Sequence, residues 1–93
     1  MDAKITNEKK MTLEAIGKDL DTANDGNISV KITSSGGTNV SDELRLLESA
    51  TCAYFLRAFP RIVKEDRVSV VEQYINRVGH LLNLAAEQFN DKN

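Results

Sequence analysis

Apolar residues recur at helical spacing throughout the second half of the chain. Two segments carry them at intervals of three and four residues, and Pro60 separates these segments. The pattern predicts two long helices, Ser41 to Phe59 and Asp66 to Phe89, and leaves open whether Pro60 ends the first or begins the second. A helix with one neighbour needs only a narrow apolar stripe. Both segments exceed this, so we expect the surplus surface to meet another subunit or a partner.

The first of these helices is apolar on two sides. A smaller stripe of Leu46, Ala50 and Ala53 lies opposite the main one and ends at Arg57. The main stripe contains Leu44, Leu47, Thr51, Tyr54, Phe55, Ala58 and Phe59. If one stripe packs on the last helix and the other on an N-terminal helix, both are covered within a monomer. Otherwise a second molecule covers one of them.

The start of the same helix carries features that favour helix initiation. Ser41 is expected to cap the N-terminus with its hydroxyl group. Asp42 and Glu43 follow in the first turn, where the helix dipole favours negative charge.

The last helix has one broad apolar face. Its members are Val71, Tyr74, Ile75, Val78, Leu81, Leu82, Ala85, Ala86 and Phe89. They cover an arc of roughly 160°, whereas an arc of roughly 100° suffices for an ordinary surface helix. Their positions also approximate a heptad, which suits nearly antiparallel packing in a bundle. A helix of this kind needs two neighbours, and a dimer of two helical hairpins across a two-fold axis would supply them.

The first forty residues give weaker signals. Leu13, Ile16, Leu20 and Ala23 recur at three- and four-residue spacing and predict a short helix from Glu8 to about Asp21. Gly17 lies in the middle of this segment and costs a helix roughly 1 kcal/mol relative to alanine. The predicted helix therefore depends on packing against the rest of the molecule.

A strand is predicted after the turn-forming residues 24–27. Ile28, Val30 and Ile32 alternate with polar residues, which is typical of a half-buried strand from Ile28 to Thr33. Its backbone needs a partner strand. The candidates are Ala3 to Thr6, Thr38 to Val40, or another molecule, and residues 34–39 are expected to form a flexible connection.

Together these elements predict a mainly α fold with minor β content. We expect a single domain over residues 1–93, in which residues 1–40 form the N-terminal helix, strand and loop. Residues 41–93 form the helical hairpin that mediates association. A chain of this length buries only roughly 60 to 65% of its unfolded surface, so association would add to its stability.

Composition places the chain among ordinary soluble proteins. Hydrophobic residues make up 41% and charged residues 28%, and the mean hydropathy is −0.35. No charge-free stretch approaches the roughly 20 apolar residues that cross a bilayer, and early charges such as Asp2 and Lys4 interrupt any secretory signal. The single cysteine, Cys52, suits a reducing compartment. We expect a cytoplasmic location without membrane contact.

No motif for catalysis, metal binding or cofactor binding is present. The segment from Asp21 to Ile28 resembles the start of a calcium loop, but Ile32 stands where a bidentate glutamate should close the site. His80 is the only histidine, on the polar side of the last helix, and Cys52 borders an apolar stripe rather than an electropositive site. The sequence therefore predicts neither an enzyme nor a cofactor.

A basic cluster marks the connection between the two helices. It consists of Arg57, Arg61, Lys64 and Arg67. Residues 57–67 contain four basic and two acidic side chains, whereas the rest of the chain contains 8 basic and 12 acidic ones. A connection between helices whose charged side chains simply face water is enough to explain this cluster. An acidic protein or, in a dimer that doubles the patch, a nucleic acid is the alternative partner.

These observations favour a small non-enzymatic interaction protein. We expect a homodimeric regulator or inhibitor of a larger protein, of the kind found among phage and mobile-element products, with weak nucleic-acid binding as the alternative. The expected interface residues are Leu46, Tyr54, Phe59, Val71, Tyr74, Val78, Leu81, Leu82 and Phe89. The aromatic members are expected to be the anchors, because aromatic side chains dominate interface energetics.

Overall fold

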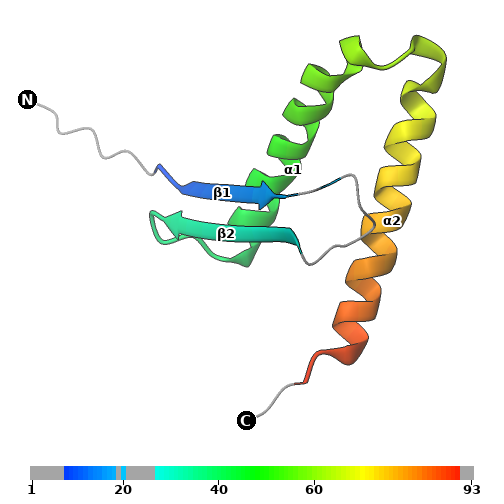
Figure 1. Cartoon of the computed structure of the whole chain (residues 1–93). Helices are drawn as coiled ribbons and strands as arrows, with labels where there is room; N and C mark the ends of the chain where they lie inside the picture. Colours follow the sequence, from blue (N-terminus) through cyan, green and yellow to red (C-terminus); the bar gives the residue numbers. More distant parts are fainter. Residues whose placement is uncertain (1–7, 19, 21–26, 91–93) are drawn as a thin grey trace, which may run out of the picture. The chain divides into compact units, whose positions relative to one another are not determined.

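A two-stranded antiparallel hairpin precedes two long helices in the computed structural model, which describes residues 8–18, 20 and 27–90 (Figure 1). The strands are β1 (Lys10–Gly17) and β2 (Ile28–Ser35), and the helices are α1 (Val40–Ala58) and α2 (Arg67–Gln88). Two short 3-10 turns, η2 (Phe59–Arg61) and η3 (Lys64–Asp66), connect the helices. The chain divides into two compact units, residues 1–50 and 51–93, and each is described by itself. The single domain over residues 1–93 stays a prediction.

The mainly α fold with minor β content is confirmed, and both predicted long helices are present. Helix α1 begins at Val40 and ends at Ala58, and α2 begins at Arg67 and ends at Gln88. Pro60 lies in η2 and so follows the first helix instead of beginning the second. Because proline has no backbone N–H, it cannot continue the hydrogen bonding of an α-helix.

The predicted N-terminal helix from Glu8 to Asp21 is wrong, because β1 occupies most of this segment. Within the described part of the chain there is no third long helix. The spacing of Leu13, Ile16 and Leu20 competes with an alternation of Met11, Leu13 and Ala15, and the alternation prevails. Strand β2 supplies the reason, since its backbone donors and acceptors pair with those of β1.

Strand β2 confirms and extends the predicted strand to Ser35. The candidate partner Thr38 to Val40 is wrong, because this stretch leads into α1. The other candidate, Ala3 to Thr6, lies outside the described residues. So do most residues of the calcium-like segment, 21–26, together with Ala23 of the predicted helix.

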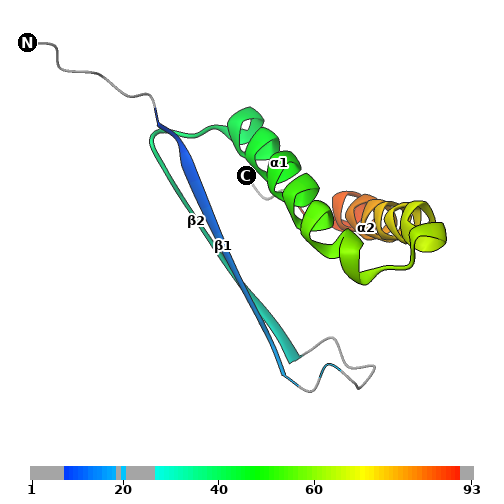
Figure 2. The ribbon, with the colours of Figure 1, turned by 90° about the horizontal axis from the view of Figure 1, so that it is seen from above.

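The register of the hairpin gives it one apolar face. Leu13 pairs with Ile32, Ala15 pairs with Val30, and Met11 lies on the same side. The opposite face carries the pairs Thr12 with Thr33 and Glu14 with Lys31. The strands twist about each other along their whole length (Figure 2). A two-stranded sheet is marginally stable alone, so its apolar face calls for a covering surface.

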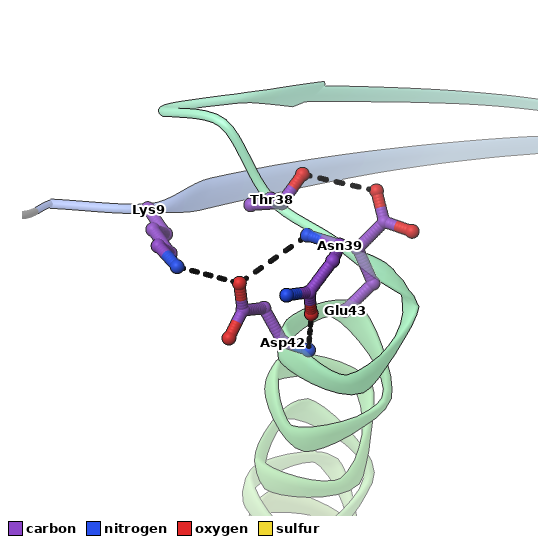
Figure 3. Close-up of polar contacts among 5 residues, drawn as sticks. All are labelled: Lys9, Thr38, Asn39, Asp42 and Glu43. Atoms are coloured by element: carbon purple, nitrogen blue, oxygen red, sulfur yellow. Dashed lines mark hydrogen bonds and ion pairs between the residues drawn. The ribbon is translucent and has the colours of Figure 1, made fainter.

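Asn39, not Ser41, caps the first helix. The Asn39 side-chain oxygen accepts a hydrogen bond from the Asp42 backbone N–H at 2.8 Å (Figure 3). In return, the Asn39 backbone N–H donates to Asp42 Oδ2 at 3.2 Å. This reciprocal pair is a capping box. The prediction for Ser41 is wrong because the helix begins one residue earlier, at Val40.

The two acidic residues of the first turn also connect α1 to the base of the hairpin. Lys9 Nζ lies 2.6 Å from Asp42 Oδ2, an ion pair between partly exposed side chains (Figure 3). Glu43 Oε2 accepts hydrogen bonds from the hydroxyl groups of Ser34 at 2.6 Å and Thr38 at 3.1 Å. These contacts hold the start of α1 next to the start of β1 and the end of β2.

Gly36 and Gly37 form the turn between β2 and α1, and both have positive φ, at 80° and 69°. A Cβ atom at Gly36 would collide with the backbone carbonyl oxygen of Glu8, whereas a Cβ atom at Gly37 would meet open space. Gly37→Ala should cost only the strain of the left-handed backbone, about 1 kcal/mol. Gly36→Ala adds the collision, and we expect a loss of about 2 to 3 kcal/mol. Urea unfolding of both variants measures the difference, and equal losses would contradict this account.

Very little of the described part of the chain is buried. Ala58 is the one buried hydrophobic residue there, at 5% exposure. Large apolar side chains are exposed on β1, β2, α1 and α2. No helix among the described residues is long and apolar enough to cross a membrane. Most large apolar side chains among the described residues are thus at the surface of their unit.

Candidate functional site

Arg67 holds the turn between the two helices through hydrogen bonds to its backbone. Its Nε atom donates hydrogen bonds to the backbone oxygens of Phe59 at 3.0 Å and Ile62 at 3.1 Å. The Ile62 backbone N–H also donates to the Phe59 oxygen at 2.9 Å. Arg67, the first residue of α2, therefore satisfies two carbonyl groups of the turn that follows α1.

An aromatic cluster joins the end of α1 to the first half of α2. The ring of Phe55 lies 5.3 Å from that of Tyr74 and 5.4 Å from that of Tyr54, both in edge-to-face geometry. The Phe59 ring lies 6.0 Å away in a tilted arrangement. Edge-to-face pairs add about 0.5 to 1.5 kcal/mol beyond the area that they bury. Phe55 is thus the centre of the contact between the two helical segments.

An apolar groove opens beside this cluster, within the unit of residues 51–93. It has a volume of about 370 Å³. Its lining consists of Thr51, Cys52, Phe55, Leu56 and Phe59 from the α1 side, and of Val71, Tyr74 and Ile75 from α2. Apolar side chains on two sides and an open mouth make it suitable for side chains of another helix.

The apolar face of α2 continues beyond the groove, and most of its described side chains there are exposed. Val78 is half-buried, but Leu81 and Leu82 are 57% and 62% exposed. Phe89, just after the helix, is 74% exposed. Contiguous exposed apolar side chains of this kind mark interaction surfaces in soluble proteins.

The structure distributes the predicted interface residues over four places. Phe59, Val71 and Tyr74 line the groove. Val78, Leu81, Leu82 and Phe89 extend along α2 from it. Tyr54 is 54% exposed at the edge of the aromatic cluster. Leu46 is apart from them, half-buried in a shallow depression with Lys9, Asp42, Arg45 and Ser49. The N-terminal helix that was one candidate to cover Leu46 is a strand instead.

Sequence reasoning missed several members of this surface. Cys52, Phe55, Leu56 and Ile75 line the groove but were not among the expected interface residues. Phe55 and Ile75 lie on the apolar stripes that the helical spacing predicts, so the sequence did carry a signal for these two residues. The apolar face of the hairpin was missed because β1 was predicted as a helix. Its residues Leu13, Ile28, Val30 and Ile32 are 48 to 57% exposed.

Three members of the basic cluster have exposed side chains. Arg57, Arg61 and Lys64 are exposed and make no hydrogen bond or ion pair within the described part of the chain. Arg67 is half-buried and bonded to backbone oxygens, as described above. Its guanidinium group is therefore engaged in hydrogen bonds within the chain. The cluster thus offers an anionic partner three cations per chain rather than four.

Among the described residues, the carboxyl group of Asp42 has a shifted pKa. The hydrogen bond from Lys9, and then that from the Asn39 backbone, lower the pKa of Asp42 below its ordinary value of 3.8. A lowered pKa in the folded state means that this contact is at full strength above pH 3.8. It is lost as the pH falls through the lowered pKa. Lys9→Gln should raise the Asp42 pKa toward 3.8, whereas Lys10→Gln should leave it in place. Carboxyl chemical shifts measured by NMR during titration test this, and an unchanged pKa in Lys9→Gln would contradict the assignment.

Metal-ligating side chains do not gather among the described residues. No three His, Cys, Asp or Glu side chains there lie close enough to hold a metal ion. Cys52 and His80 are both exposed. The candidate site is an apolar surface, with the groove and the exposed face of α2 as its main parts. Comparison of the chain with protein-family models, curated proteins and solved structures finds no match.

Proposed function

We propose that this chain is a non-enzymatic protein–protein interaction module. In this proposal it forms a homodimer through its helices and regulates or inhibits a larger protein by binding it in the cytoplasm. The observation that carries the proposal is the contrast between one buried apolar residue, Ala58, and exposed apolar side chains on every long element of the described chain. Soluble monomers rarely expose such surface over large contiguous patches.

Each of the two compact units has an apolar surface, and this supports two kinds of contact. The helical surface consists of the groove and the exposed face of α2. The hairpin surface consists of Leu13, Val30, Ile32 and their neighbours on the same face. We assign self-association to the helical surface, because a broad helical face suits a bundle. The hairpin surface is left for the larger protein.

A pair of hairpin variants tests binding to a larger protein. Ile32→Lys places a charge on the apolar face, whereas Thr33→Lys places the same charge on the polar face. Tagged chain is used to capture proteins from cells in which it is native, and mass spectrometry identifies them. The proposal expects a protein retained by the wild type and by Thr33→Lys but lost with Ile32→Lys. Equal retention by all three chains, or no specific capture by any, would contradict it.

Nucleic-acid binding is the second candidate, supported by the three exposed cations Arg57, Arg61 and Lys64, for which the described residues offer no ion-pair partner. A dimer would present six. Binding through phosphate contacts falls steeply with salt, and neutralising Arg61 and Lys64 should weaken it. Electrophoretic shift assays at low salt test this candidate, and the absence of binding there removes it.

A further inference from the structure

The hairpin is joined to α1 through two adjacent glycines that have different surroundings. Gly36 lies against the residue that precedes β1, since a Cβ atom there would collide with the backbone carbonyl oxygen of Glu8. Gly37 has a φ of 69°, and a Cβ atom there would meet open space. Glycine takes positive and negative φ about as readily. Of the two glycines, Gly37 is therefore the one whose backbone is less restrained by its neighbours.

The capping box marks the point where the body of the helix begins. Asn39 and Asp42 bond each other reciprocally, and the Glu43 backbone N–H donates to the Asn39 carbonyl oxygen at 2.9 Å. These bonds make Asn39 part of α1. The close approach to Glu8 makes Gly36 part of the hairpin. The link between the hairpin and the helix thus consists of residues 37 and 38.

Two side-chain contacts cross this link (Figure 3 shows the first of them). Lys9, next to the start of β1, has its Nζ atom 2.6 Å from Asp42 Oδ2. Ser34, near the end of β2, donates its hydroxyl group to Glu43 Oε2 at 2.6 Å. The side chains of the ion pair are 39% and 26% exposed, and exposed ion pairs are weak and reversible contacts.

Apolar packing adds little to these polar contacts. On the apolar face of the hairpin, Leu13 and Val30 are 48% and 57% exposed. Leu44, in the first half of α1, is 60% exposed. About half or more of each side chain therefore lies outside any apolar contact. The orientation of the hairpin relative to the start of α1 thus depends largely on the polar contacts across the link.

We propose that Gly37 is a hinge between the hairpin and α1, and that the contacts of Lys9 with Asp42 and of Ser34 with Glu43 form a latch across it. When the latch opens, the hairpin rotates about Gly37 as one body, because its own backbone pairing is unaffected. The latch therefore sets the direction in which the apolar face of the hairpin points relative to the start of α1. This device needs no second copy and no partner.

Distances between two spin labels test the latch. In a Cys52→Ser background, nitroxides on Ser29→Cys in β2 and Glu48→Cys in α1 report the orientation of the hairpin. The labelled chain is diluted with unlabelled chain, so that only distances within one chain are measured. Residue 29 lies six residues before the end of β2, so a rotation of about 20° displaces it by roughly 7 Å. The intact latch should give a narrow distance distribution, and Lys9→Gln with Ser34→Ala should roughly double its width.

The matched control is Lys10→Gln with Ser35→Ala. It makes the same two chemical changes one residue away, at a cross-strand pair of the hairpin, and should leave the width unchanged. Circular dichroism checks that each variant is folded, and the single variants Lys9→Gln and Ser34→Ala replace the double variant if it unfolds. A broad distribution with the latch intact would overturn the proposal. Equal widths for the latch variant and the control would also overturn it.

Gly37→Asn tests the hinge itself. Asparagine tolerates positive φ but has fewer accessible backbone conformations than glycine. Its Cβ atom would enter open space, so the substitution adds no collision. Together with the two latch substitutions, Gly37→Asn should give a narrower distribution than those substitutions alone. An unchanged width would overturn Gly37 as the hinge.

Discussion

Leu82→Lys is expected to convert the dimer into a monomer. Leu82 is 62% exposed and lies on the apolar face of α2 to which the proposed homodimer is assigned. Lysine there brings a charge into an apolar contact, and the two-fold axis doubles the effect. A loss of about 2 kcal/mol at each of the two sites raises the dissociation constant by about a thousandfold. Sedimentation equilibrium over a range of concentrations measures the change.

Asn83→Lys is the matched control for this variant. It adds the same charge one residue later, on the polar side of α2, and should leave the dissociation constant within a few-fold of the wild type. Cys52 gives an independent readout, because it lines the groove and is exposed in the single chain. A thiol reagent should react with it faster in Leu82→Lys than in Asn83→Lys. Equal dissociation constants for both variants would contradict a role for Leu82 at the interface.

Phe55→Ala is expected to destabilise the helical unit. Phe55 is half-buried and contacts Tyr74 across the two helical segments at a ring distance of 5.3 Å. A fully buried phenylalanine replaced by alanine costs about 3 to 5 kcal/mol, and partial exposure reduces the expected loss to about 2 kcal/mol. Loss of the ring also removes one wall of the groove, so dimerisation should weaken as well. Urea unfolding followed by circular dichroism measures the stability.

Tyr54→Ala removes a ring of similar size from the same helix. Tyr54 is 54% exposed, and its ring contact is with Phe55 on α1 itself. Its loss should therefore cost less than half of what Phe55→Ala costs. A larger loss from Tyr54→Ala than from Phe55→Ala would mean that Phe55 is not the centre of the helical contact.

The sequence predicted the helices well because their signal is long and periodic. Both helix boundaries fall within one residue of those predicted, and Pro60 gave the position of the turn. The cap was predicted two residues late, at Ser41 instead of Asn39. Both side chains can cap a helix, and the residue that does so is decided by where helical hydrogen bonding begins.

The N-terminal strand was not predictable in the same way. Leu13 belongs both to a helical pattern with Ile16 and to an alternating pattern with Met11 and Ala15. Short segments of this kind take the structure that their partner imposes, and the partner here is β2. The sequence did indicate that the backbone of β2 needs a partner strand. It did not indicate that the segment from Lys10 to Gly17 supplies it.

The groove was predictable only in part. The wide apolar arc of α2 indicated a second neighbour, and Val71, Tyr74 and Phe59 were expected at an interface. Which residues of α1 face α2 depends on the geometry of the turn. The bonds from Arg67 to the Phe59 and Ile62 oxygens help to fix that turn, and a basic side chain bonded to backbone carbonyls leaves no periodic signal in a sequence.

The molar mass of the chain in solution tests the central claim most directly. Light scattering coupled to size exclusion at micromolar concentration should give about twice the chain mass of 10.3 kDa for the wild type. Leu82→Lys should give the mass of a single chain under the same conditions. A wild-type mass of one chain across the micromolar range would contradict the account, because the apolar groove and the exposed face of α2 would then have no second copy to cover them.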